Sequence, residues 1–150
     1  MLLRRAESKD VRDIFLWRND AQTRAMSRNA KPLDEQAHNV WFKEALVDPD
    51  RVLLLGVILE IPVGMVRFDK QSDVKSWEIS ITLAPCERGK GFGRVMLMLA
   101  VEHFFFVYPS SILLAEVKQS NIVSRRLFES AGYRHESNHA EILQFSLSCK

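Results

Sequence analysis

The sequence predicts an α/β protein of the α+β type, in which helices flank a mixed, mostly antiparallel central sheet. Two apolar runs, residues 51–59 and 63–68, are separated by a short turn, and residues 75–83 alternate between apolar and polar side chains. These segments predict an antiparallel meander. A glycine-rich segment, a long apolar helical run and another strand-like run then predict a β-helix-β crossover. The expected order is βααβββαβαβ, which contains four helices.

The chain is expected to begin with a strand and a helix. Residues 2–6 form the strand, and Ser8 or Asp10 can cap the helix after it. That helix carries Val11, Ile14, Phe15 and Arg18 at helical spacing. Asn19 and Asp20 are weak helix formers and weaken its end.

A second helix and a hairpin complete the first half. Asp34 is positioned to cap the helix, and its buried stripe is predicted to be Ala37, Val40, Trp41, Ala45 and Leu46. Asp48-Pro49-Asp50 ends this helix. The hairpin strands at 51–59 and 63–68 are expected to turn at residues 60–62.

The second half is expected to continue with a helix, a strand, a helix and a strand, at residues 93–107, 111–117, 121–131 and 140–147. Pro109 stops the first of these helices. Asn121 opens the second, and Gly132 caps its end.

Composition favours one soluble domain over residues 1–150. The chain is 47% apolar and 27% charged, without a membrane-length apolar run or a signal peptide, so we expect a cytoplasmic protein that binds no membrane. Cys86 and Cys149 lie too far apart in sequence to suggest a disulfide framework or a metal site. The net charge of +2 is too small to indicate a nucleic-acid partner.

The segment Arg88-Gly89-Lys90-Gly91-Phe92-Gly93 is the strongest candidate for a ligand site. Glycines let the backbone turn tightly, so that peptide N–H groups converge on an anion at the start of the helix near Arg94. Arg88 and Lys90 add cations. The spacing fits neither a Walker loop nor a dinucleotide fingerprint. We therefore expect a phosphate group to bind here.

Together with the order of elements, Arg88-x-x-Gly91-x-Gly93 resembles the acyl-CoA pyrophosphate loop of the GNAT (Gcn5-related) N-acetyltransferases. Asn121-x-x-Ser124, followed by residues 127–133, is similar to the family's fourth-helix segment. The resemblance implies a central sheet of about seven strands flanked by four helices. It also implies an acetyl-CoA:amine N-acetyltransferase with acetyl-CoA as cosubstrate and no metal. It implies that Asn121 and Ser124 face the CoA arm.

The resemblance also implies roles for backbone groups and for the leaving thiolate. A splay between the fourth and fifth strands would let backbone groups of Ile81, Thr82 and Leu83 pair with pantetheine, and N–H groups there would form the oxyanion site. The family commonly has a proton-donating Tyr where this chain has Phe128. Ser124, a water or Tyr133 could replace it, or the thiolate could leave unassisted, since a thiol pKa of about 8.5 makes it a tolerable leaving group.

Glu78 is the candidate general base, because the amine must lose a proton to become nucleophilic. It lies on the polar face of the strand at 75–83 with Ser80 and Thr82, about five residues before the strand end. Burial near Trp77 and Phe68 is expected to raise the pKa of Glu78 toward the working pH. The alternative is an ordinary carboxylate on an exposed strand face.

The first half resembles, more narrowly, the subgroup that N-acetylates 4-amino-sugar nucleotides in pseudaminic or legionaminic acid synthesis. The matching segments are Trp17-Arg18-Asn19-Asp20, Ser27, His38-x-x-Trp41-Phe42 and Gly64-x-x-Arg67-Phe68-Asp69. By this resemblance Arg18 and His38 lie near a nucleotide-sugar site. Trp41 either belongs to the core or walls that site, and Arg67 and Lys70 suit a phosphate-bearing substrate.

Other acceptors and roles stay open at this point. Trp-Arg-Asn also occurs in GNAT enzymes that act on antibiotics or protein N-termini, and Phe128 leaves room for a CoA-binding sensor without turnover. The expected partner is a small-molecule amine acceptor, and a homodimer is one assembly that the chain could form. His135-Glu136-Ser137-Asn138-His139 spells a zinc-protease motif, but it follows a helix-ending glycine and is expected to lie outside any helix.

Overall fold

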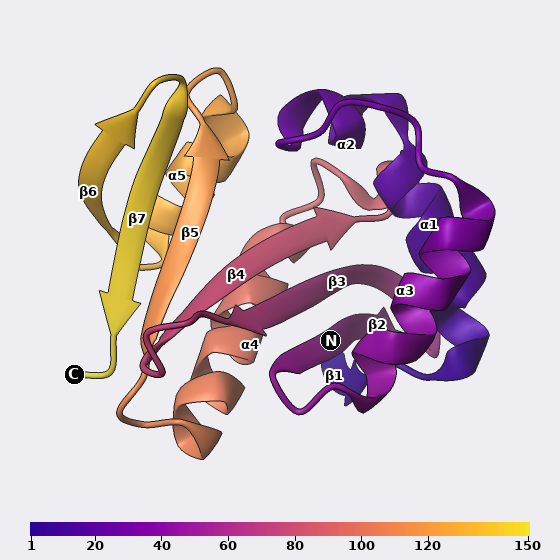
Figure 1. Ribbon diagram of the computed structural model, residues 1–150, viewed down its shortest axis with the longest axis horizontal. Coiled ribbons are helices and arrows are strands. Elements are labelled where there is room, and N and C mark those ends of the chain that lie inside the picture. The colour runs from indigo at the N-terminus through magenta and orange to yellow at the C-terminus, as the bar shows by residue number, and fades with distance from the viewer.

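The computed structural model describes residues 1–150 and shows one seven-stranded sheet in the order β1-β2-β3-β4-β5-β7-β6 (Figure 1). The strands are β1 (Leu2–Arg5), β2 (Arg51–Ile58), β3 (Ile61–Lys70), β4 (Ser76–Leu83), β5 (Ile112–Lys118), β6 (Arg134–His139) and β7 (Ile142–Ser148). Only β4 and β5 pair in parallel; every other neighbouring pair is antiparallel. The predicted meander and crossover are confirmed.

Five α-helices accompany the sheet: α1 (Val11–Asn19), α2 (Ala21–Met26), α3 (Glu35–Val47), α4 (Phe92–Val107) and α5 (Ile122–Ser130). Short 3-10 turns precede α1 at Ser8–Asp10 and α4 at Pro85–Glu87. None of these helices is long and apolar enough to cross a bilayer. The prediction of four helices missed α2. Asp20 ends α1 as expected, but its carboxylate also accepts a hydrogen bond from Thr23 N–H and caps a new helix.

The sheet separates two apolar clusters. The larger holds 17 buried residues and includes the inward side of α4, with Phe104 stacked on Phe68 and in edge contact with Trp77. The smaller holds eight, and packs α1 and α3 against the opposite face through Ile14 and Phe42. In Figure 1, α1 and α3 stand in front of β2 and β3, and α4 passes behind the sheet.

Two local expectations are corrected. The hairpin between β2 and β3 turns at Leu59 and Glu60, both with positive φ, so that Pro62 already lies in β3. The buried side of α3 consists of His38, Phe42 and Ala45, whereas Val40 is exposed. The segment that spells His-Glu-x-x-His lies outside any helix, as expected, and forms the edge strand β6, which pairs with β7.

The feature that positions the site is the splay between β4 and β5. Pairing between these strands covers only Ser76 to Glu78, opposite Ile112 to Leu114. Beyond Glu78, β4 continues alongside β3 to Leu83, and β5 diverges from it (Figure 1). The gap therefore opens at the end of β4 that leads into the glycine-rich loop and α4.

Candidate active site

The loop before α4 presents unbonded backbone donors. Gly89 and Gly91 have φ values of 74° and 80°, a region that disfavours side chains with a Cβ. The N–H groups of Gly89, Lys90 and Gly91 donate to no group of the chain, and no side chain caps α4. The first-turn N–H groups of α4 have no intrahelical partner either. These unbonded donors are of the kind that binds an anion at the start of a helix.

The basic side chains of the loop are bound to protein groups. Arg88 Nη2 lies 2.6 Å from Asp20 Oδ2 and 2.7 Å from Thr23 Oγ1, at the start of α2. Lys90 Nζ lies 3.0 Å from Glu87 Oε2. Arg94 is exposed in the first turn of α4 and makes no ion pair. Arg88 therefore fastens the loop to α2, and the backbone N–H groups are the donors of the loop that stay free.

Gly93 lies at the helix side of this loop and allows α4 to approach β4 closely. A Cβ built on it would lie 3.4 Å from a methyl of Leu83. Phe92 begins α4 and is half-buried.

The splayed end of β4 offers further backbone groups. Ala84 N–H donates to Val63 O, and Gln71 N–H donates to Ser76 O, which places even-numbered residues of β4 in the hydrogen-bonded pairs with β3. The backbone of Thr82 is consequently occupied by β3. The backbone groups of Ile81 and Leu83 point toward the gap, beyond the last pair with β5. Two of the three predicted residues thus present free backbone there.

Helix α5 begins as the sequence predicts. The Asn121 side-chain oxygen accepts from Ser124 N–H at 3.1 Å and caps the helix. At the other end, Gly132 N–H donates to Glu129 O and Tyr133 N–H donates to Phe128 O, which forms a Schellman motif.

Neither aromatic residue near the end of α5 is placed to protonate a thiolate readily. Phe128 is buried and has no donor, and the Tyr133 ring packs edge-on against it with centroids 5.0 Å apart. The Tyr133 hydroxyl is buried without a hydrogen-bond partner, and this burial raises the pKa of Tyr133 above its usual value. Tyr133 thus belongs to the core.

Glu78 lies on the face of the sheet that α1 and α3 partly cover. It pairs across strands with Asp69, and its side chain is 22% exposed. The expected burial beside Trp77 and Phe68 is wrong, because both of those rings lie in the cluster on the opposite face. Arg28, from the loop after α2, forms an ion pair with the Glu78 carboxylate instead.

A cluster of three arginines surrounds the Trp41 ring on the same face. The guanidinium carbons of Arg18, Arg67 and Arg51 lie 4.3, 5.6 and 5.8 Å from the ring centroid. Asp69 forms ion pairs with Arg67 at 2.7 Å and with Arg51 at 3.2 Å. Arg18 has no carboxylate partner. Its burial and the charges of Arg67 and Arg51 lower the pKa of Arg18 to about 10.

His38 is buried beneath Arg18. Its Nε2 lies 3.0 Å from Val11 O, an atom that can only accept, so Nε2 carries the proton. Its Nδ1 then accepts from Arg18 Nη1 at 3.4 Å. Burial, with the neighbouring Arg18 charge, lowers the pKa of His38, which is consistent with a neutral ring. Both ring nitrogens are thus used inside the protein.

Lys70 lies apart from this cluster. Its Nζ is 5.9 Å from the Trp77 ring and 3.7 Å from Asp50, toward the α4 side of the sheet. The structure thus brings together Arg18, Trp41 and Arg67, but not Lys70.

Sequence reasoning missed Arg51, Asp69, Arg28 and Glu116 as neighbours of the site. The register of β3 against β4 places Asp69 opposite Glu78, and alternation along β3 could have placed it beside Arg67. No local pattern identifies Arg28, because its partners lie 50 or more positions later in the chain.

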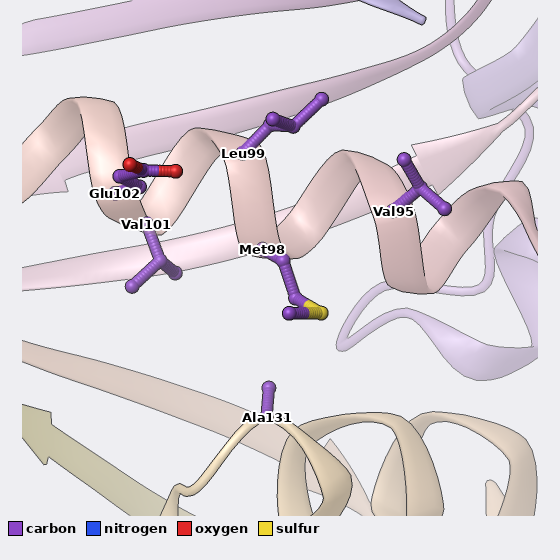
Figure 2. Close-up of a pocket in the computed structure, with 6 residues that line it drawn as sticks. All are labelled: Val95, Met98, Leu99, Val101, Glu102 and Ala131. Atoms are coloured by element: carbon purple, nitrogen blue, oxygen red, sulfur yellow. The ribbon is translucent and has the colours of Figure 1, made fainter.

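An apolar cavity of about 520 Å³ lies between α4 and the end of α5, away from Glu78 and Arg18. Figure 2 shows Val95, Met98 and Val101 on α4 and Ala131 across the gap from them. Its first residue, Val95, is one turn from the glycine-rich loop. The cavity thus adjoins the glycine-rich loop rather than the face of the sheet that carries Glu78 and Arg18.

His135 and His139 lie on β6 and are exposed. The motif is therefore on a strand, where the two side chains cannot share a helical face. No group of three or more His, Cys, Asp or Glu side chains in the structure is arranged to hold a metal ion.

Comparison with known proteins agrees with this geometry. A family model described as an acetyltransferase (GNAT) domain matches residues 1–134. A search of the curated proteins found no match.

Among solved structures, the chain is similar to a spermidine N-acetyltransferase from Vibrio cholerae in complex with CoA and spermine, at 18% identity and a TM-score of 0.86, over 97% of this chain and 94% of that one. It is also similar to a ribosomal-protein-alanine N-acetyltransferase from Brucella melitensis, at 20% identity and a TM-score of 0.83, over 99% of both chains. A third similar structure is that of a putative acetyltransferase from Salmonella typhimurium with acetyl-CoA. It is 19% identical, with a TM-score of 0.82, over 100% of this chain and 94% of that one.

The class defined by this fold and loop is that of the acyltransferases that use a CoA thioester. The chain belongs to the GNAT acetyltransferase family. It is an N-acetyltransferase whose cosubstrate is acetyl-CoA. The free N–H groups before α4 and the unpaired edge of β4 fit a pyrophosphate and an amide-bearing arm, respectively.

Proposed function

We propose that the acceptor carries an anionic group in addition to its amine, and that the favoured class is a nucleotide-linked 4-amino sugar. The observation that carries this proposal is the arginine cluster around Trp41, in which Arg18 has no carboxylate partner. Guanidinium groups bind phosphate oxygens in a bidentate manner, which suits them to a nucleotide diphosphate.

The charges around Trp41 do not cancel. Arg67 and Arg51 share Asp69, and Arg51 additionally approaches Asp48 at 3.6 Å, whereas Arg18 pairs with neither carboxylate. The lowered pKa of Arg18 has burial as its largest cause, followed by repulsion from Arg67. At about 10 this pKa still leaves Arg18 charged at neutral pH. An anion bound here would relieve that repulsion.

His38 contributes indirectly in this proposal. The Arg18–His38 hydrogen bond and the cation–π contact with Trp41 hold the guanidinium in one orientation. His38 thus orients Arg18 rather than contacting the acceptor.

The reaction requires few groups from the protein. Acetyl-CoA supplies an activated acetyl group as its thioester. Glu78 accepts the proton that the acceptor amine must lose, directly or through water. Backbone N–H groups of Ile81 and Leu83 are the proposed donors to the oxyanion. Because Phe128 has no proton to donate, the thiolate leaves as an anion, which its ordinary pKa of about 8.5 permits.

A second candidate is a cationic acceptor, such as an aminoglycoside or a protein N-terminus. The carboxylates of Glu78 and Glu116 favour it, because together they already bind the guanidinium of Arg28. One of the similar structures is a complex with spermine, a polycation.

The two candidates are separated by changing Arg18. Arg18→Ala is expected to raise the acceptor KM about tenfold or more toward a nucleotide-linked amino sugar, the equivalent of one charge-assisted hydrogen bond. It should not change KM toward the same amino sugar without its nucleotide, nor acetyl-CoA binding. Initial rates of CoA release at varied acceptor concentration measure the KM of both acceptors.

Lys70→Ala is the matched control, since it removes a cation from the opposite side of the sheet. It should leave both acceptor KM values unchanged. If Arg18→Ala impairs the two acceptors equally, anion recognition by Arg18 is wrong and the cationic acceptor becomes the better candidate.

A further inference from the structure

Arg28 connects the two strands that border the splay. It lies in the loop between α2 and α3, and its Nη2 atom contacts Glu78 Oε1 on β4 and, at 2.7 Å, Glu116 Oε2 on β5. The Arg28 side chain is 60% exposed, whereas those of Glu78 and Glu116 are 22% and 28% exposed. One exposed guanidinium thus joins two half-buried carboxylates across the gap.

Helix α2, which precedes Arg28 in the chain, is fastened at both ends. Lys118 Nζ on β5 donates to Ala25 O near the end of α2 at 2.9 Å. At the start of α2, Asp20 and Thr23 bind Arg88 of the glycine-rich loop. Helix α2 therefore spans from the loop before α4 to β5, and this arrangement brings Arg28 to Glu78.

The charged neighbours of Glu78 come from three elements. On β3, Asp69 lies opposite Glu78 but is already paired with Arg67 and Arg51. On β5, Glu116 contributes a second negative charge. Arg28 is the one cation in contact with the Glu78 carboxylate. The hydrogen bond to Glu78, ahead of the Glu116 charge, raises the pKa of Arg28 above its ordinary value.

We propose that Arg28 is a positioning residue for Glu78, with Glu116 as its anchor. The guanidinium holds the Glu78 carboxylate toward β5, where the splay opens. This inference rests on the proposed role of Glu78 as the base. It adds that the pH at which the enzyme becomes active is set by a residue of the α2–α3 loop.

The proposal predicts opposite pH effects for the two partners of Arg28. In Arg28→Met, Glu78 loses its only cationic contact, so it protonates at higher pH. The acidic limb of the kcat/KM profile should move up by on the order of one pH unit. In Glu116→Gln, Glu78 loses a negatively charged neighbour and Arg28 pairs with Glu78 alone. The acidic limb should therefore move to lower pH.

The pH–rate profiles are measured on the full chain with saturating acetyl-CoA and one amine acceptor that is turned over. Arg28→Lys, which keeps the charge, should restore most of the wild-type profile. Lys118→Met is the matched control, because it breaks the other tie of the segment to β5 without touching Glu78. It should leave the limb in place.

The outcomes separate this inference from the proposed function. Limbs that move in opposite directions support it. If the acidic limb stays in place in Arg28→Met and in Glu116→Gln while Glu78→Gln abolishes most activity, the role of Arg28 is overturned. Glu78 then remains the proposed base. An active Glu78→Gln enzyme with an unchanged profile overturns both roles but leaves acetyl transfer intact. Equal upward shifts in Arg28→Met and Lys118→Met would indicate loss of loop order and would also overturn it.

Discussion

At the scale of single residues, the arginines of this protein differ in the groups that their guanidiniums contact. Arg4 and Arg88 each bind an aspartate with a short contact, and Arg28 binds two glutamates. Arg18 instead has a neutral histidine and an aromatic face. The first three are paired with carboxylates of the chain, whereas Arg18 beside Trp41 keeps a charge that no carboxylate balances directly.

The Arg4–Asp10 pair carries a prediction about stability. Asp10 is 3% exposed, and its carboxylate accepts from Arg4 at 2.7 and 2.8 Å and from Glu7 N–H at 2.8 Å. Burial alone would raise the pKa of Asp10, but these hydrogen bonds outweigh it and lower the pKa. Asp10→Asn leaves Arg4 unpaired and should lower the free energy of unfolding at pH 7 by about 3 kcal/mol.

The sign of the pH dependence follows from the lowered pKa. Stability from Asp10 is fully present above the unfolded-state pKa of about 3.9 and is lost as pH falls through the lower folded-state value. Urea unfolding at pH 7 and near pH 3 should therefore show the gap between wild type and Asp10→Asn shrinking in acid. Lys9→Ala, which breaks only the exposed Lys9–Glu7 pair, should change stability little. A constant gap would contradict this account.

At the scale of elements, the glycine-rich loop carries a prediction about the cosubstrate. Gly91 has a φ of 80°, where a β-branched residue is strained, and open space lies beside it. Gly91→Val should turn the neighbouring N–H groups away from their common point and weaken acetyl-CoA binding at least about tenfold, since about 1.4 kcal/mol suffices for that.

Calorimetry of acetyl-CoA binding measures this effect. Lys90→Ala is the control, because its side chain is half exposed and bound to Glu87. It should change affinity much less. Equal affinities for wild type and Gly91→Val would show that the loop is not the pyrophosphate site.

The elements that the sequence predicted best are those with strong local signals. The alternation in β4, the glycine-rich turn into α4 and the Asn121 and Gly132 caps of α5 are all local patterns, and the structure has each of them. Helix α2 was missed because six residues with no buried side chain give no periodic signal. Strand β6 was missed because all its residues are exposed.

At the scale of the whole molecule, the site depends on contacts that no local pattern contains. The positions of Glu78 and Arg67 on one face follow from strand alternation and register, and were partly predictable. The ion pair of Arg28 with Glu78 and that of Arg88 with Asp20 join segments 50 and 68 positions apart. Such pairs depend on how α2 lies across the splay, so the sequence alone could not identify them.

At this scale, the proposed function places the CoA side and the acceptor side together at the splay of β4. The glycine-rich loop and the unpaired edge of β4 form one side. Glu78 and the arginine cluster around Trp41 form the other, with a net positive charge at the cluster. An acceptor with an amine near one end and a phosphate near the other matches that distribution.

The most direct measurement is the rate of CoA thiol release by the wild-type protein at saturating acetyl-CoA, with three acceptors compared at the same pH. These are a nucleotide-linked 4-amino sugar, the same amino sugar without its nucleotide, and spermidine. We expect kcat/KM to be at least about tenfold higher for the nucleotide-linked acceptor, in line with one or more charge-assisted hydrogen bonds to phosphate. A kcat/KM for spermidine equal to or above that of the nucleotide-linked sugar would contradict the account.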